Sequence, residues 1–213
     1  MPKCPGVPSW RNPTPPRRFA RGAPLTIPTP HPMLATALPT EGYASPATGR
    51  PVLVQPEGGR HLHAFGDHLH VLLSTASTNG ALAVALLTTP AGSGPPPHVH
   101  HREAEVFVVL DGEVEFWQHD GDGGTWTRVA PGGAAFLPRG VPHTYRNAGT
   151  GPSRQLVITA PGGFDEFFAG CAAVFAASEA VGPGAPPDLG EIVRVSTAHG
   201  IEYLVPLGAP PAA

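Results

Sequence analysis

The chain is poor in the residues that support thiol and amine chemistry. Of its 213 residues only Cys4 and Cys171 are cysteines, so we expect no disulfide framework and no thiolate metal site, with Cys171 a small core residue. Lys3 is the only lysine, which excludes Schiff-base catalysis from the rest of the chain. No apolar run approaches the length that crosses a bilayer, so we expect no membrane partner.

Charge is also scarce and unevenly spread. Charged residues make up 14% of the chain and the formal net charge is −3. Residues 1–40 carry five basic and no acidic side chains, whereas the remainder is acidic, which argues against a nucleic-acid partner. Prolines interrupt the basic N-terminal segment, so no export signal is predicted and we expect a cytoplasmic protein. Met33, the only internal methionine, leaves open a start of translation at that residue.

Glycine and proline are abundant, at 27 and 29 residues. Over residues 1–48 they accompany no periodic apolar pattern, which predicts a disordered Pro/Arg-rich extension. Over residues 49–161 they separate short apolar runs and are typical of turns in a β-barrel domain. Residues 162–213 are predicted to form a helical segment and a tail.

Many short strands are predicted between these turns, which indicates an all-β, antiparallel jelly-roll barrel. The turns are expected at Gly66-Asp67, Asp111-Gly112 and 120–124. The predicted strands span residues 51–55, 62–65, 69–74, 81–88, 98–100, 105–110, 113–119, 125–129, 134–137, 143–147 and 155–159.

One or two helices follow the barrel. Apolar residues recur at helical spacing from Phe164 to Phe175, and this aromatic stripe allows two interpretations. The favoured one is packing on the outside of the barrel or in a dimer interface; the other is closure of the barrel mouth over an aromatic substrate. From Leu189 to His199 a helix is predicted with Asp188 as its cap, although a β-branched run leaves a strand open there.

Three imidazoles and one carboxylate are candidate ligands of one metal ion. His98 and His100 point to the same face of a strand because side chains alternate. Glu105 lies on the next apolar run, and His143 comes from a distant strand. Neutral imidazole and carboxylate suit Fe, Ni, Mn, Co, Cu or Zn, and four protein ligands leave coordination positions open.

The spacing around these residues resembles both conserved windows of the cupin family. The windows read Gly92-x5-His98-x-His100-x4-Glu105-x6-Gly112 and Gly132-x5-Pro138-x-Gly140-x2-His143-x3-Asn147. The resemblance implies that the three histidines and Glu105 bind one divalent metal ion, with Fe, Ni, Mn, Co and Cu all compatible. It also implies a homodimer. The alternative is a degenerate barrel in which these side chains are merely packed.

Four short stretches of the sequence are similar to those of the single-domain bacterial quercetin 2,3-dioxygenases within that family. The similar stretches are GPPPHVH, EVFVVLDGE, PRGVPHTYRN and PGGFDEFF. The resemblance implies a dioxygenase that uses a flavonol or similar enolisable aromatic and dioxygen, with Glu105 as proton acceptor. Phe107 and Tyr145, which share faces with Glu105 and His143, are candidate pocket walls or plain core. A sugar isomerase or epimerase and a non-catalytic metal- or small-molecule-binding module remain open.

A second group of histidines flanks the predicted turn at Gly66. His61, His63, His68 and His70 are expected to share one face of a hairpin. A polar outer face is the favoured interpretation, and a second metal site or a contribution to the pocket rim is the alternative.

Overall fold

The computed structural model describes residues 51–119 and 124–204, all of which belong to one compact unit spanning residues 42–213. The predicted N-terminal extension, residues 120–123 of a predicted turn and the C-terminal tail from residue 205 lie outside the described residues.

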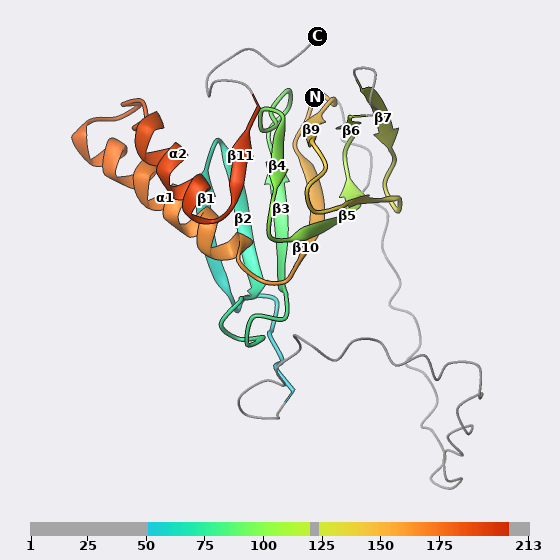
Figure 1. Cartoon of the computed structure of the whole chain (residues 1–213), viewed down its shortest axis with the longest axis horizontal. Helices are drawn as coiled ribbons and strands as arrows, with labels where there is room; N and C mark the ends of the chain where they lie inside the picture. Colours follow the sequence, from blue (N-terminus) through green and yellow to red (C-terminus); the bar gives the residue numbers. More distant parts are fainter. Residues whose placement is uncertain (1–50, 120–123, 205–213) are drawn as a thin grey trace, which may run out of the picture. The chain divides into compact units, whose positions relative to one another are not determined.

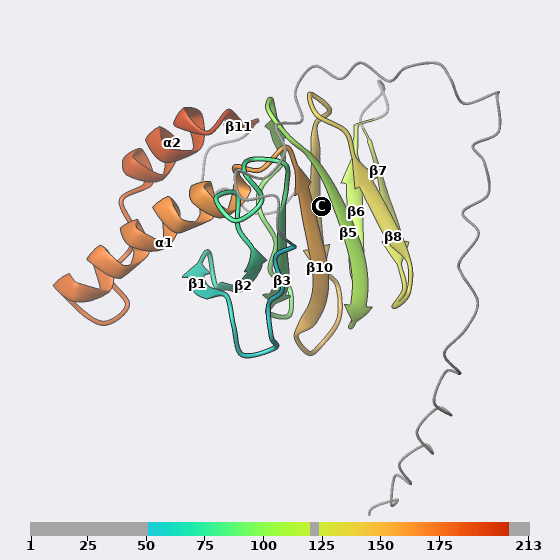
Figure 2. The same ribbon diagram turned by 90° about the horizontal axis from the view of Figure 1, so that it is seen from below.

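Two antiparallel sheets make up the body of the unit (Figures 1 and 2). The six-stranded sheet has the order β1 (Arg60–Ala64), β2 (Asp67–Leu73), β3 (Ala83–Thr89), β10 (Ser153–Ala160), β5 (Ala104–Asp111) and β8 (Ala134–Leu137). The five-stranded sheet has the order β11 (Ile201–Tyr203), β4 (His98–His100), β9 (His143–Asn147), β6 (Val114–Gln118) and β7 (Thr125–Val129). Neighbours in each sheet are mostly distant in sequence, as in a jelly roll.

Alternation of apolar and polar residues explains why these segments form sheets with one buried face. Every second residue of β3 and of β10 is buried. The core contains Leu69 and Val109 from the larger sheet and Val114 and Phe116 from the smaller one, each at most 2% exposed. The jelly-roll fold expected from the sequence is therefore the one observed.

One predicted strand is absent, one turn is displaced, and one strand was not predicted. Residues 51–55 form no strand: Leu53 is 86% exposed, and prolines at 51 and 56 limit backbone pairing. The turn between β1 and β2 lies at Phe65-Gly66, one residue earlier than predicted, so that Asp67 begins β2. Strand β11 was not predicted, because three residues after a helix carry too little periodicity to be recognised.

Two helices cover one side of the strands (Figures 1 and 2). Helix α1 (Phe164–Val181) packs against β1 and α2, and α2 (Leu189–Ala198) also contacts β11. α1 is six residues longer than predicted, since the added segment contains good helix formers such as alanine and glutamate. The Asp188 cap is confirmed: its carboxylate accepts a hydrogen bond from the Glu191 amide at 3.1 Å.

Candidate metal centre

The four predicted ligands come together between the two sheets. His98 lies directly opposite His143 in the β4–β9 pairing, and His100 is on the same face of β4. Glu105 comes from β5 of the other sheet. Their ligand atoms all lie within 4.8 Å of one another, and all four side chains are buried. This group could bind a metal ion.

Backbone and side-chain acceptors orient the three imidazoles. The Nδ1 atoms of His98 and His143 lie 2.9 and 2.8 Å from the carbonyl oxygens of Pro96 and Val141. A carbonyl oxygen can only accept, so each Nδ1 carries a proton. Nε2 is therefore the nitrogen that each ring turns toward the interior of the cluster, where it is available to a metal ion.

Glu103 completes this arrangement, and sequence reasoning missed it. Its Oε1 lies 3.0 Å from Nδ1 of His100, and the side chain is 2% exposed. A carboxylate that accepts from a ligating imidazole fixes the ring and strengthens it as a donor. The spacing His100-x-x-Glu103 was the available signal, but the ligand motif drew attention to Glu105 instead.

The charge states of His98 and Glu105 fit a cation. Burial, reinforced by His100 and His143, lowers the pKa of His98 to about 3, so this ring is neutral. Burial would raise the pKa of Glu105, yet the neighbouring imidazoles lower it to about 2, so it is ionised. Oε2 of Glu105 lies 3.2 Å from Nε2 of His143 and 3.6 Å from Nε2 of His100. A divalent cation would satisfy these converging lone pairs, so the donor set fits a metal.

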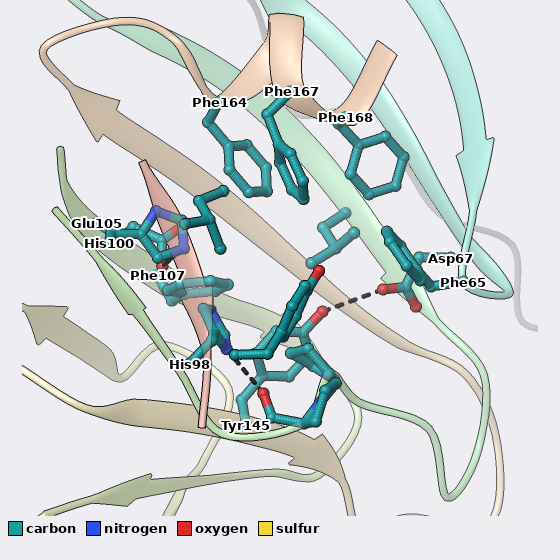
Figure 3. Close-up of a pocket in the computed structure, with 15 residues that line it drawn as sticks. Phe65, Asp67, His98, His100, Glu105, Phe107, Tyr145, Phe164, Phe167 and Phe168 are labelled. Atoms are coloured by element: carbon teal, nitrogen blue, oxygen red, sulfur yellow. Dashed lines mark hydrogen bonds and ion pairs between the residues drawn. The ribbon is translucent and has the colours of Figure 1, made fainter. Parts of the chain in front are cut away.

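The cluster opens onto a cavity of about 60 Å³ inside the barrel (Figure 3). Phe107 and Tyr145, predicted as wall residues, both line it. Phe107 contacts Tyr145 with ring centroids 5.4 Å apart. Asp67 and Tyr203 also line the cavity and were not predicted. Among the described residues, no arginine or lysine lines it.

The first turns of helix α1 form one wall of this cavity. Phe164, Phe167 and Phe168 project into it from α1 (Figure 3). The favoured interpretation of the aromatic stripe, packing outside the barrel, is therefore wrong for these three residues. They lie at the start of the stripe, and their helical spacing could not distinguish a core face from a pocket wall.

Phe65 closes another part of the cavity in a conformation that is unfavourable for its type. Its φ is 58°, followed by Gly66 at 82°, as in a tight hairpin turn that favours Asn-Gly. The Phe65 ring packs edge-on against Phe168 and Phe175, at 6.3 and 5.2 Å between centroids. The aromatic ring at this turn position is therefore maintained by its contacts with α1, against the local backbone preference.

The four histidines of the β1–β2 hairpin lie on one of its faces, as predicted: His61, His63, His68 and His70. His61 pairs with His70 and His63 with His68, and the rings stack at 4.1 and 4.6 Å between centroids. Within residues 51–119 and 124–204, however, the cluster around His98 is the only group of three or more potential ligands that converges. The structure gives the hairpin no metal-binding geometry.

Comparison with known proteins agrees with this geometry. A family model described as "Cupin domain" matches residues 85–159, which include all four candidate ligands. The chain contains a cupin domain. Quercetin 2,3-dioxygenase of Bacillus subtilis (strain 168) is 32% identical to it over 106 residues, covering 49% of this chain and 30% of that protein. Germin-like protein 1-1 of Oryza sativa subsp. japonica is 31% identical over 109 residues, covering 51% and 48%.

The cupin domain thus spans half the length or less of these curated relatives. Among solved structures, a conserved protein with a double-stranded beta-helix domain from Klebsiella pneumoniae subsp. pneumoniae aligns at 26% identity. That alignment covers 51% of this chain and 84% of the other, with a TM-score of 0.38. In the described part of the chain, neither helix is both long and apolar enough to cross a bilayer.

Proposed function

We propose that the protein is a metal-dependent dioxygenase of the quercetin 2,3-dioxygenase-like cupin type, acting on an enolisable aromatic. The observation that carries the proposal is the position of the three-histidine, one-glutamate cluster at the end of a pocket with aromatic walls. Such walls bind a flat ring by stacking and burial. The similarity to a quercetin 2,3-dioxygenase supports the same activity.

The size of the cavity narrows the substrate. About 60 Å³ of cavity holds only a few water molecules and is smaller than the roughly 150 Å³ of an apolar cavity that accepts benzene, so even a single ring requires the wall to give a little. A three-ring flavonol would require Phe65 and the phenylalanines of α1 to move outward. We therefore favour a single-ring enolisable compound, with flavonols accepted only if this aromatic wall opens.

The chain's own residues supply positioning and proton transfer. His98, His100, His143 and Glu105 would hold a divalent metal, which when bound would supply Lewis acidity toward a substrate hydroxyl. Glu105 accepts the proton of that hydroxyl, since it is ionised and buried at the cluster. Phe107 and Tyr145 hold the ring, and the largely apolar wall limits the access of bulk water. Both oxygen atoms of dioxygen enter the product, so no external reductant is needed.

The absence of a cation from the cavity lining weighs against a phosphosugar isomerase. Binding a phosphate in a buried site needs arginine, lysine or a helix N-terminus nearby. Among the described residues that line this cavity there is no arginine or lysine. The start of α1 lies at the cavity, but its first turn carries Asp165 and Glu166, whose charges oppose a bound phosphate. An apolar, neutral ring is the better match.

The test is oxygen consumption by metal-loaded protein with flavonols and single-ring enolisable phenols, in air and under nitrogen. Glu105→Gln is expected to lower the rate at least about 100-fold, because it removes the proton acceptor. Glu113→Gln is the matched control, since Glu113 lies on the surface in an ion pair with Arg128.

Three outcomes decide the matter. Oxygen uptake by the wild type that is lost in Glu105→Gln supports the proposal. Undiminished turnover in a Glu105→Gln variant of full metal content would make the base assignment wrong. No oxygen uptake with any compound, despite full metal loading of the wild type, would refute the dioxygenase and favour a binding module.

A further inference from the structure

A buried carboxylate faces the cavity on the side away from the metal cluster. Asp67 is the first residue of β2, and Figure 3 shows its side chain across the pocket from His98 and His100. It is 7% exposed. Oδ2 accepts a hydrogen bond from the Tyr145 hydroxyl at 3.1 Å. Oδ1 is buried and has no hydrogen-bond partner among the described residues.

Leaving Oδ1 of Asp67 buried without a hydrogen bond costs free energy of folding. Burial raises the pKa of Asp67 to about 6, although the nearby hydroxyls of Thr89 and Tyr145 favour the ionised form. The surrounding cavity wall includes Phe65 and Phe168, which cannot donate a hydrogen bond. The turn before β2 does not need an aspartate here, since Asp67 lies after its two central residues. A buried acceptor that faces a cavity and has no well-formed hydrogen bond at Oδ1 indicates a ligand contact.

We propose that Asp67, held in place by Tyr145, is a second anchor of the pocket and accepts a hydrogen bond from a substrate hydroxyl. With the metal cluster at one end and Asp67 at the other, the preferred substrate is a compact aromatic that carries two hydroxyl groups. A carboxylate accepts but does not donate, so an ether in place of the second hydroxyl is rejected. The identity of the first anchor rests on the proposed function, whereas the contact with Asp67 does not depend on oxidation.

The experiment measures binding without turnover. Metal-loaded protein is titrated calorimetrically under nitrogen with phenol, 1,3-dihydroxybenzene, 1,4-dihydroxybenzene and 4-methoxyphenol. In the wild type at least one dihydroxy isomer is expected to bind about tenfold or more tightly than phenol, as for a hydrogen bond to a charged group. 4-Methoxyphenol is expected to bind no more tightly than phenol.

In Asp67→Asn the amide oxygen accepts the hydrogen bond from Tyr145, and the NH2 group, which only donates, takes the place of the free acceptor. The preference is therefore expected to disappear. Asp111→Asn is the matched control, because Asp111 is exposed at the far end of β5 and its substitution keeps the preference. Metal content and thermal unfolding of both variants show that cluster and fold are retained.

Equal affinities of the wild type for phenol and both dihydroxy isomers would overturn the proposal. So would a preference that survives in Asp67→Asn, or tight binding of 4-methoxyphenol by the wild type, a result that needs no variant to fold. A dihydroxy preference without oxygen uptake would refute the dioxygenase but keep the anchor. Oxygen uptake without the preference would do the reverse.

Discussion

At the scale of single residues, the hydrogen bonds behind the ligands matter as much as the ligands themselves. Backbone carbonyls orient His98 and His143, but a side chain, Glu103, orients His100. A hydrogen bond to a backbone carbonyl survives most side-chain substitutions. A hydrogen bond to a side-chain carboxylate is lost when that one residue is replaced. Glu103 is therefore the most direct test of whether the cluster is built to hold a metal.

Glu103→Ala is expected to weaken metal binding about 10- to 100-fold, because His100 loses the acceptor that fixes its ring. Glu103→Gln keeps an acceptor oxygen and is expected to lose less. Competition with a chelator of known affinity measures both, with Glu113→Gln as the surface control. Unchanged affinity in Glu103→Ala would show that the ring orientation does not depend on this carboxylate.

The Asp67 carboxyl makes stability depend on pH. Its pKa is about 6 in the folded chain and 3.8 ordinarily, so as pH rises the unfolded chain loses this proton first. Unfolding therefore becomes more favourable between about pH 4 and 6, by roughly 3 kcal/mol at most. Asp67→Asn is expected to be more stable than the wild type at pH 7.5, with a smaller difference at pH 5.

Urea unfolding of the two proteins between pH 5 and pH 8 measures this difference. A variant that gained nothing at pH 7.5 would show that the folded protein compensates the buried charge in full. A gain in stability together with loss of the dihydroxy preference is the pattern expected for a residue maintained by function.

At the scale of elements, the start of helix α1 decides the shape of the pocket. Its first residues, Phe164, Phe167 and Phe168, line the cavity, and Asp165 lies between them. Asp165 accepts hydrogen bonds from the Thr75 amide at 3.1 and 3.2 Å and from the Thr75 hydroxyl. These bonds tie the helix to the segment that joins β2 and β3.

Asp165→Ala is expected to destabilise the fold by about 1–3 kcal/mol, since it leaves the partly buried Thr75 amide without its hydrogen-bond acceptor. It should also loosen the aromatic wall and relax discrimination between single-ring and larger ligands. Chemical denaturation gives the first effect and ligand titration the second. Asp188→Ala, which removes the cap of α2 instead, is the control that should alter stability but leave ligand size unaffected.

At the scale of the whole molecule, the metal cluster joins the two sheets. Three ligands come from the smaller sheet and Glu105 from the larger one, so a bound ion would link them. A ligand that binds only the folded state stabilises it in proportion to the logarithm of its concentration. Metal loading should therefore appear as a change in global stability.

A metal present at about 100 times its Kd is expected to stabilise the fold by about 2.7 kcal/mol. For a chain of this size that raises Tm by roughly 5–10 °C. Thermal unfolding with and without a chelator measures the shift, which should vanish in His98→Ala/His143→Ala. An equal shift in that double variant would place the stabilising ion elsewhere.

Much of this molecule is determined by local pattern. Alternation of apolar residues identified most strands, and the bounds of β4, β7, β8 and β9 agree with prediction. The ligand types and their spacing on two strands were also readable, because a strand fixes which side chains share a face. Residues 51–55 show the limit: an apolar run becomes a strand only if a neighbour pairs with it.

Contacts between distant segments were decided only by the tertiary structure. Tyr145 donates to Asp67 from 78 positions away, and nothing in either local sequence indicates that pairing. The same holds for the phenylalanines of α1, whose helical periodicity identified an apolar face but not what it covers. Periodicity arises from neighbouring backbone geometry, whereas the far end of the pocket exists only once the two sheets and the helix have packed together.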